Sequence, residues 1–238
     1  RAFMLWTALK SDIAHRSPDE KDREAASDML GLMTPVLKGV LTDKGFEHAA
    51  MAQQVFGGHG YIEEHGMSQF VRDARIAMIY EGANGIQALD LVGRKLAMNG
   101  GRAIQAFFKE VGDFCEEYRS DEKMAPFTKA LKKGLNDLQA ATLWLMQNGM
   151  QNPDNAGAAS TDYMHLTGLV VTGYMWGLMA RTAQTALAGG AEEGAAFYEN
   201  KLTTARFFME RVMPETAAHL ARISSGADAM MALPAEAF

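Results

Sequence analysis

Apolar residues recur every three or four positions along most of this chain of 238 residues, and this spacing constrains its fold more than any other feature. The clearest stretch consists of Ile104, Phe107, Phe108, Val111, Phe114, Cys115 and Tyr118. A second apolar stripe begins at Phe127 and ends at Leu145. Only 6 prolines are present, so few positions would interrupt a helix. The sequence therefore predicts an all-α protein.

Composition limits the function classes. The chain is 48% hydrophobic and 22% charged, which is typical of a globular protein with a buried core. A net charge of −6 argues against a nucleic-acid interface, which needs a basic face. Cys115 is the one cysteine, so no internal disulfide can form and a reducing compartment such as the cytoplasm is favoured. Gly168–Ala180 is the most apolar segment but is shorter than the roughly 20 residues of a membrane span, so we expect a buried core helix.

The first part of the chain contains several predicted helix boundaries. No cap precedes the apolar residues that follow Arg1, so we expect the chain to begin inside a helix of a longer protein. Ser17-Pro18-Asp19-Glu20 predicts a capping box, and Thr34-Pro35 predicts a further helix start. A helix over 43–56 is expected to stop at Gly57-Gly58.

The next segment is predicted to be less regular. Residues 57–66 are expected to form a loop, 67–73 a short helix and 74–83 an extended segment. Another helix is expected from Asn84, ending at Asn99-Gly100-Gly101. We place a domain boundary at this double glycine.

The remainder, 102–238, is predicted to be an antiparallel helical bundle. Ser160 is expected to cap a long helix that ends near Leu187. Pro214 is expected to interrupt the last long helix. The sequence therefore predicts two successive helical bundles, 1–98 and 102–238.

The glycines at Gly57-Gly58-His59-Gly60 allow two interpretations. They could let a phosphate approach the backbone closely, but a helix precedes them and the third glycine of a dinucleotide fingerprint is missing. A plain helix stop is the simpler interpretation. The nearby His59, Glu63, Glu64 and His65 match no helical zinc pattern and are interpreted as solvated loop residues.

Glu81 lies between an aromatic residue, Tyr80, and a flexible one, Gly82. A carboxylic acid in apolar surroundings has a raised pKa and can act as a base near neutral pH. The simpler interpretation from spacing alone is an acid at the start of a helix, where the helix dipole favours negative charge.

Three motifs follow one another in the first half of the chain, and they are QVFGGHGY at 54–61, RDAR at 72–75 and IYEGANGIQ at 79–87. In this order and spacing they resemble the C-terminal part of the acyl-CoA dehydrogenase family. The resemblance covers residues 1–98 as the family's C-terminal helical domain, without its first helix or so. Residues 102–238 look like the extra helical domain of larger bacterial members, a subgroup that includes enzymes acting on long-chain acyl-CoAs and on methylmercaptopropionyl-CoA.

The resemblance implies a flavoprotein of fatty acid beta-oxidation that uses FAD. Such an enzyme removes two hydrogens from the α and β carbons of an acyl-CoA substrate and leaves a trans-2-enoyl-CoA. Glu81 would take the α-proton while the β-hydrogen passes as hydride to the flavin. Tyr80 and Gly82 would line the thioester pocket.

Cofactor and subunit contacts are implied in the same way. Gln54, Gly57 and Gly58 match positions that reach the ADP part of FAD bound to a neighbouring subunit. Ala83 and Gly85 occupy flavin-contacting positions where the family commonly has Thr and Gln. The resemblance thus implies a homodimer or homotetramer, with electron-transfer flavoprotein as the electron acceptor.

Two other functions stay open at the level of the sequence. An acyl-CoA oxidase would use the same base and pass its electrons to oxygen. A helical assembly module would have lost catalysis. Residues 1–238 alone are expected to fold without holding FAD or catalysing, because the resemblance implies that other domains supply most flavin and substrate contacts. The 102–238 bundle is expected to shape oligomer contacts or acyl-chain access.

Overall fold

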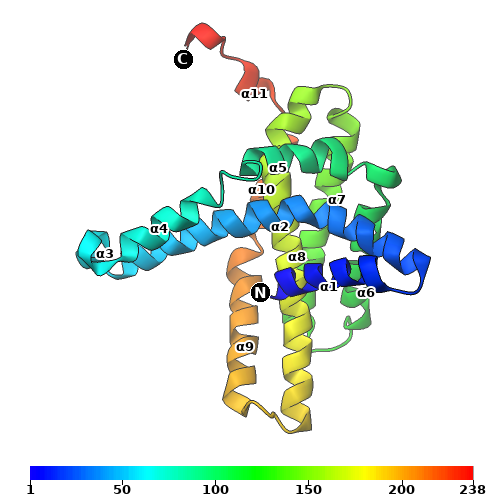
Figure 1. Ribbon diagram of the computed structural model, residues 1–238. Coiled ribbons are helices and arrows are strands. Elements are labelled where there is room, and N and C mark those ends of the chain that lie inside the picture. The colour runs from blue at the N-terminus through cyan, green and yellow to red at the C-terminus, as the bar shows by residue number, and fades with distance from the viewer. Residues whose placement is uncertain (238) are drawn as a thin grey trace.

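The computed structural model describes residues 1–237, and every element in this part of the chain is a helix (Figure 1). The all-α prediction is therefore confirmed. The elements are α1 (Ala2–Arg16), α2 (Glu20–Val55), α3 (Gly58–Tyr61), η1 (Glu63–His65), α4 (Met67–Ile76), α5 (Asn84–Asp90), η2 (Leu91–Lys95), η3 (Met98–Gly101), α6 (Arg102–Glu117), α7 (Ala125–Asn148), α8 (Pro153–Gly189), α9 (Ala195–Phe207), η4 (Phe208–Val212), α10 (Glu215–Ser224), α11 (Asp228–Met231) and η5 (Ala235–Ala237).

Helix α2 is continuous over 36 residues, which corrects the predicted helix start at Thr34-Pro35 and the predicted separate helix over 43–56. A proline inside a helix costs about 3 kcal/mol, because it removes one hydrogen bond and crowds the preceding turn. Burial of each large apolar side chain stabilises by about 1.5–3 kcal/mol. Helix α2 buries such side chains on both sides of Pro35, namely Met29, Leu32, Met33, Val36 and Val40. Packing therefore outweighs the local cost.

The start of α2 differs from the predicted capping box. Asp19, rather than Ser17, caps the helix, since its Oδ1 accepts the backbone N–H of Lys21 at 2.8 Å. Ser17 lies before the helix, where its Oγ accepts the N–H of Asp19 at 3.2 Å. The prediction found the right turn but assigned the cap to the wrong side chain.

Helix α8 begins at Pro153, so the predicted cap at Ser160 is wrong. Asn152 is the cap and accepts the backbone N–H of Asp154 at 3.0 Å. Ser160 is buried inside the helix, where its hydroxyl donates to the carbonyl of an earlier turn. The predicted interruption at Pro214 is confirmed, because α9 passes into η4 and α10 begins after the proline.

The segment between α2 and α5 is more helical than predicted. The expected loop over 57–66 contains α3 and η1, and the short helix over 67–73 is confirmed and extends further, as α4. The expected extended segment over 74–83 is wrong, since its first residues complete α4 and turns follow. The guanidinium carbon of Arg75 lies 5.6 Å from the ring centre of Phe46, so α4 packs along α2. A helix satisfies its own backbone there, whereas a strand would have needed a partner.

Helix α8 runs through the centre of the molecule, and glycines allow other helices to approach it closely (Figure 1). A Cβ atom on Gly168 would lie 2.7 Å from a methyl carbon of Val40 on α2, and one on Gly177 would lie 2.8 Å from the ring of Phe114 on α6. The segment Gly168–Ala180 is largely buried, which confirms the predicted core helix. Among residues 1–237, no helix is long and apolar enough to cross a membrane.

The buried core is continuous across the predicted boundary. It includes Leu32 and Leu91 before the double glycine and Phe107 and Leu166 after it. By contrast, the C-terminal half of α2 extends away from this core together with α3 and α4, forming an arm (Figure 1). The division at 99–101 stays a prediction about domains, whereas the packing joins both parts into one core.

Candidate active site

The turn between α4 and α5 carries Glu81 in an unusual backbone conformation. Its φ is +55° and that of Gly82 is +83°, so two successive residues are left-handed. For a residue other than glycine this costs about 1–2 kcal/mol, so surrounding contacts must hold it. The Glu81 side chain is exposed, and the adjacent Ile79 and Tyr80 are 50% and 52% exposed. The apolar surroundings expected around the acid are therefore not completed by residues 1–237.

Bonds within the turn hold its shape. The side-chain amide of Gln87 donates to the carbonyl of Glu81 at 3.0 Å. The backbone N–H of Asn84 donates to the carbonyl of Met78 at 3.1 Å, which closes the loop around the acid. The peptide groups on either side of Glu81 are thus fixed, while its carboxylate stays accessible.

Side chains of helix α2 bind the same turn through hydrogen bonds. The ammonium group of Lys38 donates to the carbonyl of Gly82 at 2.8 Å and to Asn84 Oδ1 at 2.6 Å. Asn84 Nδ2 donates to Asp43 Oδ1 at 2.6 Å and to Thr42 Oγ1 at 2.9 Å. The charges fix which way the amide points, because its oxygen meets an ammonium and its nitrogen meets a carboxylate.

Asp43 joins this cluster to α8. Its second oxygen, Oδ2, lies 3.0 Å from Nε2 of His165. Burial acts to raise the pKa of Asp43, but hydrogen bonds from His165 and Asn84 and the nearby positive charge of Lys38 outweigh it. The net pKa of Asp43 lies below its ordinary value, so the carboxylate is ionised at neutral pH.

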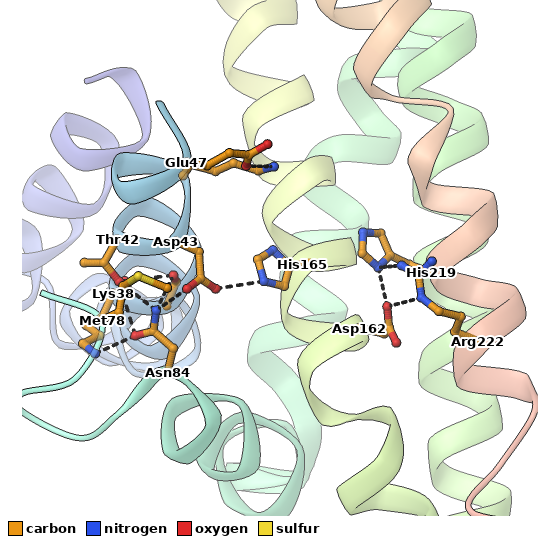
Figure 2. Close-up of polar contacts among 12 residues, drawn as sticks. Lys38, Thr42, Asp43, Glu47, Met78, Asn84, Asp162, His165, His219 and Arg222 are labelled. Carbon is orange, nitrogen blue, oxygen red and sulfur yellow. Dashed lines mark hydrogen bonds and ion pairs between the residues drawn. The ribbon is translucent and has the colours of Figure 1, made fainter. Parts of the chain in front are cut away.

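The contacts continue across α8 to α10, as Figure 2 shows. The rings of His165 and His219 are stacked, with centres 6.0 Å apart and planes 8° from parallel. Nδ1 of His219 lies 2.7 Å from Asp162 Oδ1, and Arg222 Nε donates to the same oxygen at 2.7 Å. A line of polar side chains therefore connects the Glu81 turn to the C-terminal helices.

The other predicted substrate and flavin positions lie on the same turn. Tyr80, Ala83 and Gly85 are all exposed, and a Cβ atom on Gly85 would meet no atom within 4 Å. The carbonyl of Ala83 accepts the N–H of Ile86 at 2.7 Å and starts α5. The structure thus brings these positions together with Glu81 and Gly82 on one accessible surface.

The predicted ADP-contacting residues lie elsewhere, at the tip of the arm (Figure 1). Thr42 contacts Asn84 of the turn that carries Glu81. Gln54 lies 12 positions after Thr42 on the same helix, which is a distance of about 18 Å. Gly57 has a φ of +58°, and a Cβ atom on it or on Gly58 would meet no atom within 4 Å. This open backbone fits the approach of a cofactor from outside the arm.

The remaining polar candidates make ordinary contacts. The rings of His59 and His65 have centres 5.2 Å apart, and Glu63 accepts the hydroxyl of Ser68 at 2.9 Å. Cys115, which belongs to the apolar stripe of α6, is buried, and burial raises the pKa of its thiol to about 11. A thiol of this kind stays protonated at neutral pH and is a poor nucleophile.

Sequence reasoning missed Lys38, Asp43 and His165. The first two lie five positions apart on α2, outside all three motifs, whereas the turn residues that they contact, Gly82 and Asn84, lie within the third motif. His165 lies 122 positions from Asp43 and has no charged pattern around it. The one available signal was the spacing of Lys38 and Thr42, which lie four positions apart and so share one face of the helix, with Asp43 directly after them.

Comparisons with known proteins cover nearly the whole chain. Residues 9–97 match the family model "Acyl-CoA dehydrogenase, C-terminal domain", and residues 107–234 match "Acetyl-CoA dehydrogenase C-terminal like". The chain is 36% identical to 3-methylmercaptopropionyl-CoA dehydrogenase of Ruegeria pomeroyi, over 97% of this chain and 39% of that protein. It is 30% identical to a butyryl-CoA dehydrogenase of Syntrophomonas wolfei, over 90% of this chain and 35% of that protein.

A broad-specificity linear acyl-CoA dehydrogenase of Mycobacterium tuberculosis, FadE5, is 29% identical over 90% of this chain and 36% of its own length. Among solved structures, Caenorhabditis elegans ACDH-11 in complex with C11-CoA has the same fold, with a TM-score of 0.69. That match covers 89% of this chain and 33% of ACDH-11 at 20% identity. The chain thus spans less than two fifths of the length of these relatives. Since the two family models match its two parts in succession, the chain belongs to the acyl-CoA dehydrogenase family and is a C-terminal portion of such a protein.

Proposed function

We propose that this chain is the C-terminal part of a flavin-dependent acyl-CoA dehydrogenase in which Glu81 removes the α-proton of an acyl-CoA thioester. The observation that carries the proposal is the strained, left-handed backbone of Glu81 beneath an exposed carboxylate. Strain of this kind costs about 1–3 kcal/mol and clusters at functional sites, because the surrounding structure has to maintain it. The strain lies at the acid to which the family resemblance assigns the role of base.

The chemistry needs an acid whose direction is fixed. An α-proton of a thioester is weakly acidic, so a base must approach it closely and with the right orientation. The turn supplies the orientation, because Gln87 and Lys38 bind the carbonyls of Glu81 and Gly82. The thioester would lie against the exposed surface of Tyr80 and Gly82, with Glu81 above its α carbon.

FAD, when bound, would supply the acceptor for the β-hydrogen as hydride. Ala83 and Gly85 would face its flavin, and Gln54, Gly57 and Gly58 would reach its ADP part from a neighbouring subunit. Gln54 lies about 18 Å along α2 from Thr42, which is beside the Glu81 turn. This separation supports different contact sites for the flavin and for the ADP part of FAD. Loss of the hydroxyl at Ala83 and of a side chain at Gly85 leaves the backbone to make these contacts.

The proposal includes assembly and an electron acceptor. The arm exposes large apolar side chains, among them Val55 (84%), Tyr61 (81%) and Phe70 (63%). Large exposed apolar side chains that gather on one segment are typical of interaction surfaces, which supports a homodimer or homotetramer. Electron-transfer flavoprotein is the proposed acceptor. The names of the relatives suggest butyryl-CoA and 3-methylmercaptopropionyl-CoA as substrates to test first.

The experiment uses the full-length protein with Glu81→Gln, and Glu64→Gln as a matched control at another exposed glutamate. Flavin bleaching is followed anaerobically after mixing with each thioester. Glu81→Gln should lower the reduction rate by about 10²–10⁴-fold, which is the usual contribution of a general base. Glu64→Gln should stay within about twofold of the parent. Unchanged bleaching by Glu81→Gln would remove the base assignment, and peroxide formation in air would instead assign an acyl-CoA oxidase.

A further inference from the structure

We propose that Asp43 is a positioning residue for Glu81 and that His165 of α8 holds Asp43 in place. The C-terminal helices would thereby orient the acid without touching it. This inference rests on the proposed role of Glu81 as the base. Its starting point is the division of one carboxylate between two parts of the chain, with Oδ1 bound to Asn84 and Oδ2 to His165.

The first step runs from Asp43 to the turn. Asn84 Nδ2 donates to Asp43 Oδ1 at 2.6 Å, which turns Asn84 Oδ1 toward the ammonium group of Lys38. Lys38 uses a second N–H to bind the carbonyl of Gly82, directly after Glu81. Without the Asp43 carboxylate, the side-chain amide of Asn84 could rotate and exchange its oxygen and nitrogen. Lys38 would then lose the acceptor that holds its ammonium group beside the Gly82 carbonyl.

The second step runs from Asp43 to the C-terminal helices (Figure 2). His165 approaches Asp43 Oδ2 from α8 at 3.0 Å, and its opposite side stacks on His219 of α10. Asp162 and Arg222 in turn surround His219. The imidazole of His165 therefore has neighbours on both sides, and a fixed imidazole fixes the carboxylate that it binds.

Asp137 is a half-buried carboxylate that lacks this connection. Asp137 joins α7 to α10 by accepting the hydroxyl of Thr216 at 2.7 Å and the ammonium group of Lys133 at 2.7 Å. The side chain of Asp137 is 15% exposed and that of Asp43 is 22% exposed, so both are half-buried. The contacts of Asp137 join two helices and do not reach the Glu81 turn. Asp137 thus provides a matched control for the structural effect of losing a carboxylate between helices.

The test uses the full-length protein with FAD bound and compares Asp43→Ala, His165→Phe and the control Asp137→Ala. Single-turnover flavin bleaching with butyryl-CoA gives the limiting rate and the apparent Kd. Asp43→Ala should lower the limiting rate by about tenfold, because small displacements of a positioned group reduce rates steeply. The apparent Kd should stay within about twofold. Asp137→Ala should leave both quantities within about twofold of the parent.

The His165 variants keep the test informative even if Asp43→Ala does not fold. His165→Phe retains a ring but cannot bind Asp43, so its limiting rate should fall in the same direction. His165→Gln places an amide N–H near the position of Nε2 and should recover most of that rate. Hydrogen exchange of the peptide that spans residues 78–87 should be faster in His165→Phe than in the parent. Equal rates and equal exchange in the parent, His165→Phe and Asp137→Ala would overturn the proposal.

A double variant separates this proposal from the assignment of the base. If Asp43 acts through Glu81, adding Asp43→Ala to Glu81→Gln should cause no further loss of rate. A further tenfold loss would overturn the positioning role while leaving Glu81 as the base. If Glu81→Gln itself bleaches at the parental rate, the proposed function fails, and the hold of His165 and Asp43 on the turn is then judged from the hydrogen exchange of residues 78–87 in His165→Phe, where exchange equal to that of the parent overturns it as well.

Discussion

Lys38 of α2 donates from Nζ to the backbone carbonyl of Gly82 at 2.8 Å, although the two residues are 44 positions apart in the chain. The same ammonium group binds Asn84 Oδ1 at 2.6 Å. A single half-buried lysine thus contacts the residue after Glu81 and the first residue of α5. The turn that carries the acid is therefore held by a lysine that lies before all three sequence motifs.

Replacement of this lysine should affect turnover more than binding. Lys38→Met keeps the aliphatic stem but removes both hydrogen bonds, so the Gly82 carbonyl loses its charged donor. We expect kcat in the full-length protein to fall by about tenfold, a loss of about 1.4 kcal/mol in transition-state stabilisation. Steady-state kinetics with a CoA thioester measure it.

Lys44→Met is the matched control, because Lys44 lies on the same helix and, among residues 1–237, pairs only with the nearby Glu47 at 2.6 Å. Exposed pairs of this kind contribute about 0–1 kcal/mol. The control should keep the parental kcat. An equal loss in both variants would mean that the effect comes from removing positive charge near the site rather than from the bond to Gly82.

The close crossing of α2 and α8 leads to a prediction about stability. A Cβ atom on Gly168 would lie 2.7, 2.9 and 3.2 Å from Cγ2, Cγ1 and Cβ of Val40, a side chain with little rotamer freedom. Gly168→Ala should therefore lower the free energy of unfolding by about 1–3 kcal/mol, the usual range for overpacking. Chemical denaturation of the purified chain measures this change.

Gly157 provides a control on the same helix, because a Cβ atom there would meet no atom within 4 Å. Gly157→Ala should raise the free energy of unfolding by up to about 1 kcal/mol, as expected when alanine replaces glycine inside a helix. If the two variants changed stability in the same direction, the close approach of Gly168 to Val40 would not govern the packing of these helices.

The sequence predicted the helices well but not the contacts between them. The apolar stripe that begins at Ile104 became α6, because a helix of this kind has one stable way to bury its face. Pro35 misled the prediction, since local sequence cannot reveal that both sides of the proline would be buried. The predicted extended segment over 74–83 was wrong for a similar reason, because the sequence does not show that Arg75 packs on Phe46 of α2 and so continues the helix.

The residues of the candidate site could likewise be predicted only in part. Glu81 and its neighbours could be named because they form one continuous motif that resembles a family. Asp43 and His165 could not, because 122 positions separate them and neither lies in a recognisable pattern. Local sequence was enough to name Glu81 as the proposed base, whereas the contacts that hold its turn depend on long-range packing.

The unfolding free energy should fall as the pH falls below about 6.5, through His219. Burial lowers the pKa of this imidazole, and the charges of Arg222 and His165 act in the same direction, while contacts with Asp162 oppose them. The unfolded chain therefore binds a proton at a higher pH than the folded chain. Stability is fully present above the unfolded pKa of about 6.5 and is lost toward the lowered folded pKa, with a slope of at most about 1.4 kcal/mol per pH unit.

Denaturation at a series of pH values checks this prediction. His219→Gln should flatten the slope just below pH 6.5, because the glutamine does not titrate. His48→Gln, at an exposed position of α2, should leave the slope unchanged. A parental slope that persisted in His219→Gln would assign the pH dependence to another group.

The last prediction concerns the chain by itself. Residues 1–238 should fold but hold no FAD, because the positions proposed to contact the cofactor are exposed and open. A Cβ atom on Gly57, Gly58 or Gly85 would meet no atom within 4 Å, and nothing among residues 1–237 covers the carboxylate of Glu81. Cofactors and drug-sized ligands usually bind in concave sites that bury most of their surface, which an open turn cannot do. The purified chain should be colourless after incubation with FAD and gel filtration, and its circular dichroism should be helical. A yellow chain with about one flavin per molecule would contradict the prediction and would mean that these residues hold the cofactor without the rest of the protein.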